Sequence, residues 1–246
     1  MVKAYRFSPA LCYPLCGRTM LVLSEKDVQR LIDVEDLIRA LERAHIQFSA
    51  GKAVMPVRMV VPVPEIKGRI TSMPAYLSED KALGMKVVTY FPENPGRGLP
   101  IILATIFVYS TASGKLFVTV TTAKEPIVKA EWLKPGVHIN AIGSHRPDLR
   151  EIDGATMRRA KLVVDSREAV MAECGDILLA IKEGAIEEDH IHAEIGEVLA
   201  GKKAGRTSAS EITLYKAVGI AIQDVATAKL VYERAVEKKI GVEVEV

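Results

Sequence analysis

Between residues 134 and 143 the chain has the sequence KPGVHINAIG, a turn followed by a short apolar strand that stops at a glycine. A second apolar run, Lys161–Val164, leads into Asp165 and Ser166, which are residue types that cap helices. A β-branched run, Phe117–Thr121, precedes both. Short and nearly continuous apolar strands separated by connections are typical of parallel strands that are covered on both faces. The sequence therefore predicts an α/β protein with a parallel sheet in this region.

Two amphipathic helices and an antiparallel sheet are predicted upstream of this region. Ser24 and Asp33 have the patterns of helix caps, and the second helix is expected to stop at Gly51. Apolar runs bounded by Gly and Pro predict four strands, at Met55–Val63, Arg69–Tyr76, Leu83–Tyr90 and Pro100–Tyr109. Ser113 and Gly114 indicate a hairpin-like turn after the fourth strand.

Downstream of Ser166 the pattern predicts helices alone. They are expected over residues 167–182, 188–199 and 213–239. The predicted architecture is thus a mixed-sheet part, to which both ends of the chain contribute, and a parallel-sheet part between them.

The composition is that of an ordinary globular protein, with 49% apolar and 26% charged residues. Thirty-three basic and thirty-one acidic residues leave a net charge of +2. The basic stripe that a nucleic-acid binder shows is missing, and so is an apolar run long enough to cross a bilayer. We therefore expect neither a nucleic acid nor a membrane as a partner.

The three cysteines, Cys12, Cys16 and Cys174, argue against a disulfide framework and suit a reducing cytoplasm, where we expect the protein. A zinc site that combines the first two with His45 is a weak alternative, and no metal is expected. Met1–Thr19 is expected to be a disordered extension, with Met20 as an alternative start and a targeting peptide as the other interpretation.

Two cations stand inside apolar strands and are candidates for chemistry. Arg58 lies in PVRMV, residues 56–60, and Lys86 lies in GMKVV, residues 84–88. Either charge can simply point to solvent. In a cleft, the arginine would bind a carboxylate through two bonds, and the lysine would exchange a proton with an amine or imine. The pair would therefore suit an α-amino or α-imino acid.

A ligand of a parallel α/β sheet is expected at the carboxyl ends of the strands, where residues 143–148 form the loop GSHRPD. A plain turn between strand and helix is the alternative.

His190 and His192 are two residues apart on an expected helix and cannot easily share a metal ion there. The glycine fingerprint GxGxxG of dinucleotide-binding proteins is absent; Gly96 and Gly98 come nearest, but they follow a proline-rich loop and precede a strand.

Ten ordered stretches resemble the ornithine cyclodeaminase/mu-crystallin family. They are VMPVR (54–58), SMPAY (72–76), GMKVV (84–88), FPENP (91–95), GLP (98–100), KPGVHINAIG (134–143), RPDLRE (146–151), VDS (164–166), GD (175–176) and TLYKAVG (213–219). Each stretch is a weak signal, but the ordered set is specific and runs from about residue 20 to about residue 237.

The resemblance implies a two-part enzyme that transfers a hydride between NAD or NADP and the C–N bond of an amino acid or cyclic imino acid. Residues 20–116 and 167–246 would form the substrate and dimerisation domain of a homodimer. Residues 117–166 would be the remnant of a dinucleotide-binding domain.

The resemblance also implies roles for single residues. Lys86 would be the catalytic acid/base. Arg58 and Met73 would bind the substrate, the arginine through its carboxylate. The residues expected beside the cofactor are Thr121, Gly143, Ser144, His145 and Arg146.

Two departures from the family pattern bear on function. Ornithine cyclodeaminases carry an aspartate where this chain has His145, and Arg146-Pro147-Asp148 resembles the ketimine reductases instead. After Leu116 the chain runs straight into Phe117, although the family continues there through the first Rossmann half. A βαβαβ half with a leading helix takes on the order of 80 to 90 residues.

Two hypotheses follow. The first is an NAD(P)-dependent enzyme of ketimine reductase type, with ornithine cyclodeaminase and alanine dehydrogenase types as variants. The second is a catalytically inactive truncated form that binds small molecules or dimerises at most. In either case we expect impaired dinucleotide binding, because the amides that would hold the pyrophosphate are missing.

Overall fold

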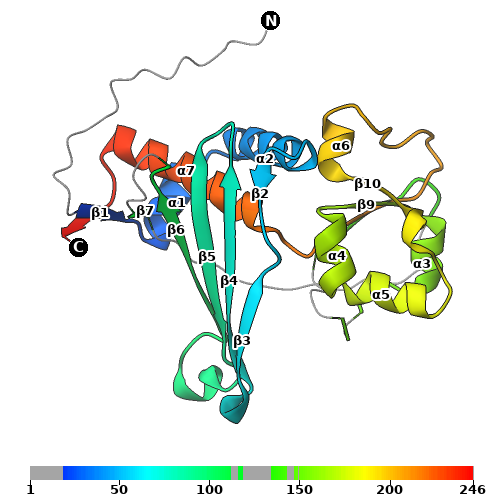
Figure 1. The fold of residues 1–246 in the computed structure, drawn as a ribbon, viewed down its shortest axis with the longest axis horizontal. Helices are drawn as coiled ribbons and strands as arrows, with labels where there is room; N and C mark the ends of the chain where they lie inside the picture. The colour runs from blue at the N-terminus through cyan, green and yellow to red at the C-terminus, as the bar shows by residue number, and fades with distance from the viewer. Residues whose placement is uncertain (1–18, 112–115, 119–133, 143–146, 149, 246) are drawn as a thin grey trace, which may run out of the picture.

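The computed structural model describes residues 19–111, 116–118, 134–142, 147–148 and 150–245. Two sheets dominate it, an antiparallel one and a parallel one (Figure 1). The expected fold class, a mixed-sheet part together with a parallel sheet, is confirmed.

The antiparallel sheet has the strand order β2-β4-β5-β6-β7, with β3 also paired to β4. Its strands are β2 (Ala53–Val54), β3 (Met59–Val63), β4 (Gly68–Leu77), β5 (Ala82–Tyr90), β6 (Ile102–Tyr109) and β7 (Leu116–Val118). The four predicted strands are present, although the first, expected from Met55, begins only at Met59. In Figure 1 strands β3 to β6 extend as a long arm away from the helices.

Strand β7 corrects one prediction. Phe117 and Val118 were expected to begin a parallel strand, but β7 pairs antiparallel with β6. The connection from β6 is too short for the crossover that a parallel neighbour needs. The rest of the predicted run, residues 119–121, and the predicted turn at residues 113–114 lie outside the described residues.

The parallel sheet has the order β10-β9-β11-β8, and all of its pairings are parallel. Its strands are β8 (His138–Ala141), β9 (Lys161–Val164), β10 (Ile191–Glu194) and β11 (Thr213–Lys216). The helices α3 (Gly154–Arg159), α4 (Arg167–Glu173), α5 (Gly175–Lys182) and α6 (Ile195–Leu199) lie around it. The sheet continues beyond residue 166, where the dinucleotide-binding remnant was expected to end.

Strands β10 and β11 were wrongly predicted as helical. Residues 191–194 alternate between buried and half-buried, and Leu214 in β11 is completely buried. Strands of only four residues, with the sequences IHAE and TLYK, are too short for a period to separate a strand from a helix turn, so their neighbours in the sheet decide between the two. The long helix consequently begins at Ala221 rather than near Thr213.

The remaining helices cover one face of the antiparallel sheet. They are α1 (Glu25–Leu31), α2 (Val34–Ser49) and α7 (Ala221–Lys238), while β1 (Thr19–Val22) pairs with β12 (Val242–Glu245). Both predicted caps are confirmed: Ser24 and Asp27 form a capping box, and Asp33 accepts a hydrogen bond from the Asp36 amide. Helix α7 packs closely on the sheet, because a Cβ at Gly84 would lie 3.0 Å from the Val225 Cγ2.

His45 on α2 makes the fold sensitive to acid. Its ring is 6% exposed, its Nε2 lies 3.1 Å from Gln223 Nε2, and burial lowers its pKa from 6.5 to about 4. The unfolded chain takes up a proton below pH 6.5 and the folded chain does not. Stability therefore falls as the pH decreases from 6.5 to 4.

We expect His45→Gln to remove about 2 kcal/mol of the stability loss that occurs between pH 7 and pH 5. Urea unfolding at both pH values measures this loss. His192→Gln, in a half-buried histidine on β10, is the control and should keep the wild-type loss. Equal losses in all three proteins would contradict the assignment to His45.

Candidate active site

A cleft lies between the two sheets. Its walls come from the segment before β3, from β4, from α4 and from the start of α7. The lining residues are Met55, Pro56, Val57, Arg58, Met73, Ser166, Glu168, Ala169, Glu173, Gly219, Ile220 and Ala221. The cleft thus joins the two predicted substrate residues, Arg58 and Met73.

Arg58 is fixed at this cleft through one nitrogen. Its Nη2 donates to the carbonyl oxygens of Val218 at 3.0 Å and Gly219 at 2.7 Å. The same nitrogen lies 2.8 Å from Oε1 of Glu173. The side chain is 16% exposed, so the guanidinium faces the cleft rather than open solvent.

Asp165 fixes the loop that holds Arg58. It follows β9 and is completely buried. Its Oδ2 accepts hydrogen bonds from the amides of Val218 at 3.0 Å and Gly219 at 2.9 Å, and its Oδ1 accepts one from Ser166 at 2.9 Å. Burial raises the pKa of Asp165, and these amides oppose that shift. Gly219 has a φ of +77°, a conformation that favours glycine.

Lys86 lies on the sheet beside the cleft. It is the direct cross-strand neighbour of Met73, so the two side chains share a face of the sheet. Its Nζ lies 3.1 Å from Oδ1 of Asp224 in the first turn of α7, and the two side chains are 22% and 19% exposed. Burial raises the pKa of Asp224, whereas Lys86 and Arg58 lower it. Lys86 itself is not among the cleft-lining residues.

A second buried network anchors the segment that follows residues 143–149. Lys216 and Asp176 are both completely buried and form an ion pair of 2.8 Å. Asp176 also accepts hydrogen bonds from the amides of Glu151 at 2.5 Å and Ile152 at 2.7 Å. Burial raises the pKa of the neighbouring Cys174 to about 11, so its thiol is no nucleophile near neutral pH.

Five expected site residues lie outside the described residues: Thr121, Gly143, Ser144, His145 and Arg146. The histidines at 190 and 192 do not converge on a common point. His190 contacts the Met157 carbonyl at 2.8 Å, and His192 contacts that of Ala204 at 2.8 Å.

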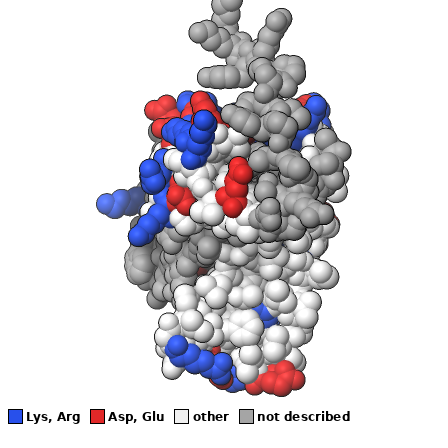
Figure 2. Space-filling view, turned by 90° about the vertical axis from the view of Figure 1, so that its left-hand side faces the viewer, with Lys and Arg blue, Asp and Glu red and all other residues white. Residues whose placement is uncertain are grey.

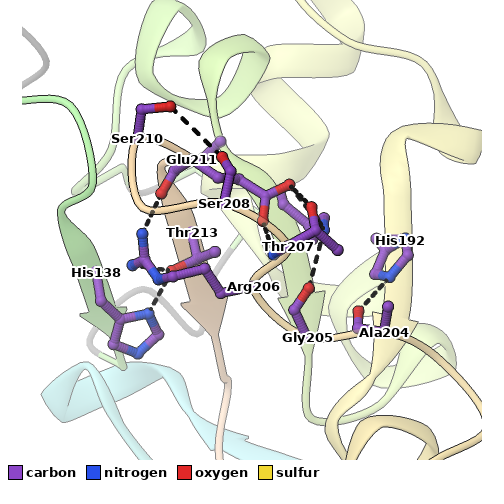
Figure 3. A network of polar contacts seen from close by, with 12 residues as sticks. His138, His192, Ala204, Gly205, Arg206, Thr207, Ser208, Ser210, Glu211 and Thr213 are labelled. Carbon is purple, nitrogen blue, oxygen red and sulfur yellow. Dashed lines mark hydrogen bonds and ion pairs between the residues drawn. The ribbon is translucent and has the colours of Figure 1, made fainter.

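The opposite edge of the parallel sheet, where its strands begin, carries a dense polar network (Figure 3). Arg206 donates to the carbonyl of Val137 at 3.2 Å and to the Thr213 hydroxyl at 2.9 Å. Lys161 lies 2.7 Å from Glu211. These side chains satisfy one another, so the network orders the loop before β11 rather than forming a ligand site.

Comparison with known proteins shows the family of the chain. The model of the ornithine cyclodeaminase/mu-crystallin family matches residues 18–118 and 115–239. The chain belongs to this family. The ketimine reductase mu-crystallin of Mus musculus is 30% identical over 309 residues, with 86% of this chain and 96% of that protein covered.

Two solved structures are similar. One is the Δ1-pyrroline-2-carboxylate reductase of Thermococcus litoralis in complex with NADH and L-proline, with a TM-score of 0.85 and 32% identity. The match covers 92% of this chain and all of that one. The other is an archaeal alanine dehydrogenase dimer with bound NAD, with a TM-score of 0.82 and 27% identity, covering 92% and 99%.

Among the described residues, three backbone amides at the carboxyl edge of the parallel sheet are already engaged by side chains of the chain itself. A pyrophosphate needs free backbone amides at the carboxyl edge of the parallel sheet. There Asp165 already accepts from two amides of the β11–α7 loop, and Glu194 accepts from the Arg167 amide at 2.9 Å. The nearest approach to the glycine fingerprint in the sequence includes Gly96. This residue lies in the turn Asn94–Arg97, in the connection between β5 and β6, and not in the parallel sheet.

The sequence did not single out two carboxylates of the site, Glu173 and Asp224. Each pairs with a predicted cation, Arg58 or Lys86, from a distant part of the chain. An acidic residue in the apolar first turn of α7 was the available signal for Asp224. Glu173 carried no comparable signal.

We expect a coupling free energy of about 1 kcal/mol between Lys86 and Asp224, because the pair is largely shielded from solvent. A double-mutant cycle of Lys86→Met and Asp224→Asn, followed by urea unfolding, measures it. Lys52 and Glu79, a pair that is 55% and 54% exposed, provide the control and should couple by less than about 0.5 kcal/mol. Equal coupling in the two pairs would contradict the assignment.

Proposed function

We propose that the chain binds an amino acid or cyclic imino acid by its carboxylate at Arg58, and that Lys86 exchanges a proton with its nitrogen. The observation that carries the proposal is the one-sided anchoring of Arg58. Within the described part of the chain, the bonds of Arg58 run through Nη2, and Nε and Nη1 have no partner there, while Arg58 lines the cleft. Guanidinium N–H groups match the geometry of a carboxylate.

The reaction supported best is that of a ketimine reductase. The similar reductase structure contains L-proline, which carries a carboxylate next to a ring nitrogen. Met55, Met73 and Ile220 give the cleft an apolar wall that suits ring carbons. Lys86 would protonate the imine nitrogen while Asp224 holds the ammonium group in place. In this family the nicotinamide supplies a hydride to the imine carbon.

Ornithine is the less suitable substrate. The mu-crystallin-like sequence Arg146-Pro147-Asp148 favours imine reduction, and the chain has His145 where cyclodeaminases have an aspartate. Alanine dehydrogenase chemistry uses the same carboxylate and nitrogen, so it stays a variant of the proposal. We further propose the cytoplasm as the location, because the three sparse cysteines suit a reducing compartment.

The carboxylate site can be tested with L-proline. We expect Arg58→Gln to weaken L-proline binding roughly thirtyfold, because a charge-assisted hydrogen bond contributes about 2 kcal/mol. Ligand-observed NMR titration measures the affinity, and circular dichroism checks the fold. Arg69→Gln is the control, because Arg69 stacks on Tyr90, 4.3 Å from its ring centroid, away from the cleft lining. Equal affinity in Arg58→Gln and wild type would refute the site.

We also propose that a segment of the dinucleotide-binding part is missing. The alignment with the mouse ketimine reductase is 309 residues long. It includes 86% of the 246 residues of this chain, which is about 212 residues. About 97 aligned positions therefore have no counterpart here. This number is close to the size of a Rossmann half. These unmatched positions favour the second candidate function. In it, the chain binds small molecules or dimerises but does not catalyse a reaction.

We expect weak binding of NADH and NADPH, with dissociation constants above about 1 mM, because the loss of the pyrophosphate site removes several kcal/mol. Titration followed by nicotinamide fluorescence measures this. The Thermococcus litoralis reductase, whose structure contains NADH, is the positive control. Micromolar affinity in this chain would contradict the proposal.

We propose a homodimer that forms through the face of the arm opposite to Lys86. Met59, Val61, Ile70 and Leu103 share this face by strand register and are 63%, 49%, 39% and 46% exposed. Figure 2 shows one side of the lower part of the molecule, where Lys, Arg, Asp and Glu are sparse and gather at the tip. An apolar face of this kind marks a protein interface, and the similar alanine dehydrogenase is a dimer.

We expect Val61→Asp to convert the dimer into a monomer, because it places a charge inside the proposed interface. Sedimentation velocity measures the mass. Val34→Asp, on α2 and 66% exposed, is the matched control and should remain dimeric. A wild-type chain that sediments as a monomer would contradict the proposal.

A further inference from the structure

Arg58 lacks a free pair of donors for a carboxylate. A guanidinium can bind a carboxylate through two bonds along its end, with Nη1 and Nη2, or along its side, with Nε and Nη2. Both arrangements use Nη2. In this chain two carbonyl oxygens and Glu173 already surround Nη2, so an arriving carboxylate finds only single donors.

Glu173 stands in an unfavourable place for a carboxylate. It is the last residue of α4, where the helix dipole repels negative charge. Its side chain is 15% exposed, and burial raises its pKa, with a further contribution from Asp165. The favourable contact that holds the charge there is the one with Arg58.

We propose that Glu173 competes with the substrate carboxylate for Nη2 of Arg58, so that ligand binding displaces it. Glu173 would then set the affinity and the selectivity of the site. A ligand with a full negative charge can replace the ion pair, whereas a neutral amide or ester cannot offset its loss. The inference rests on the proposed carboxylate site, and it adds a residue that the substrate has to displace.

The first test compares two substitutions that change the charge equally. Glu173→Gln keeps an oxygen acceptor beside Arg58 but removes the competing charge. Glu168→Gln is the control, because Glu168 lines the same cleft, whereas the ion pair of Arg58 among the described residues is with Glu173. We expect Glu173→Gln to bind L-proline about tenfold more tightly than wild type, and Glu168→Gln to stay within about twofold. Weaker binding in Glu173→Gln would overturn the inference, because Glu173 would then only position Arg58.

A second measurement needs no substrate. Phenylglyoxal modifies accessible guanidinium groups, and peptide mass spectrometry follows its reaction at Arg58. We expect a rate several times higher in Glu173→Gln than in wild type and Glu168→Gln. Equal rates in the three proteins would overturn the inference. If Arg58 reacts faster in Glu173→Gln while no protein binds L-proline, the proposed function and the competition both fail, and only the shielding of Arg58 by Glu173 remains.

Discussion

The buried carboxylate of Asp165 is the constraint on which the rest of the site depends. It holds the amides of Val218 and Gly219, and the carbonyl oxygens of the same two residues hold Arg58. One short loop thereby links the carboxyl end of the parallel sheet to the segment before β3. Because a buried carboxylate without donors is strongly destabilising, the loop and Asp165 fix each other. The cleft exists because the two sheets are joined in this way.

The same arrangement explains why the substrate half of the site can persist without a dinucleotide. Each cation of the site has its own carboxylate, Glu173 for Arg58 and Asp224 for Lys86. Neither charge needs a ligand or cofactor to be neutralised. At the described part of the sheet edge, the amides of Val218 and Gly219 donate to Asp165, and the amide of Arg167 donates to Glu194. In the described residues, the charges on the proposed substrate side are therefore balanced by carboxylates of the same chain.

The sequence predicted β3 to β6, β8 and β9, because strand period and breakers are local signals, and isolated charges in apolar runs drew attention to Arg58 and Lys86. It failed for β10 and β11, which have only four residues each and become strands through their neighbours in the sheet. It also missed Glu173 and Asp224. Their importance comes from contacts across 115 and 138 positions of sequence, and no local pattern records such contacts.

Hydrogen exchange at the Val218 and Gly219 amides tests the central claim most directly. Both amides lie in a loop, where exchange is ordinarily fast. If Asp165 fixes this loop and Arg58 completes it, both amides should exchange as slowly as the amide of Leu214 in β11. Exchange as fast as that of the exposed turn at residues 201–203 would contradict the account.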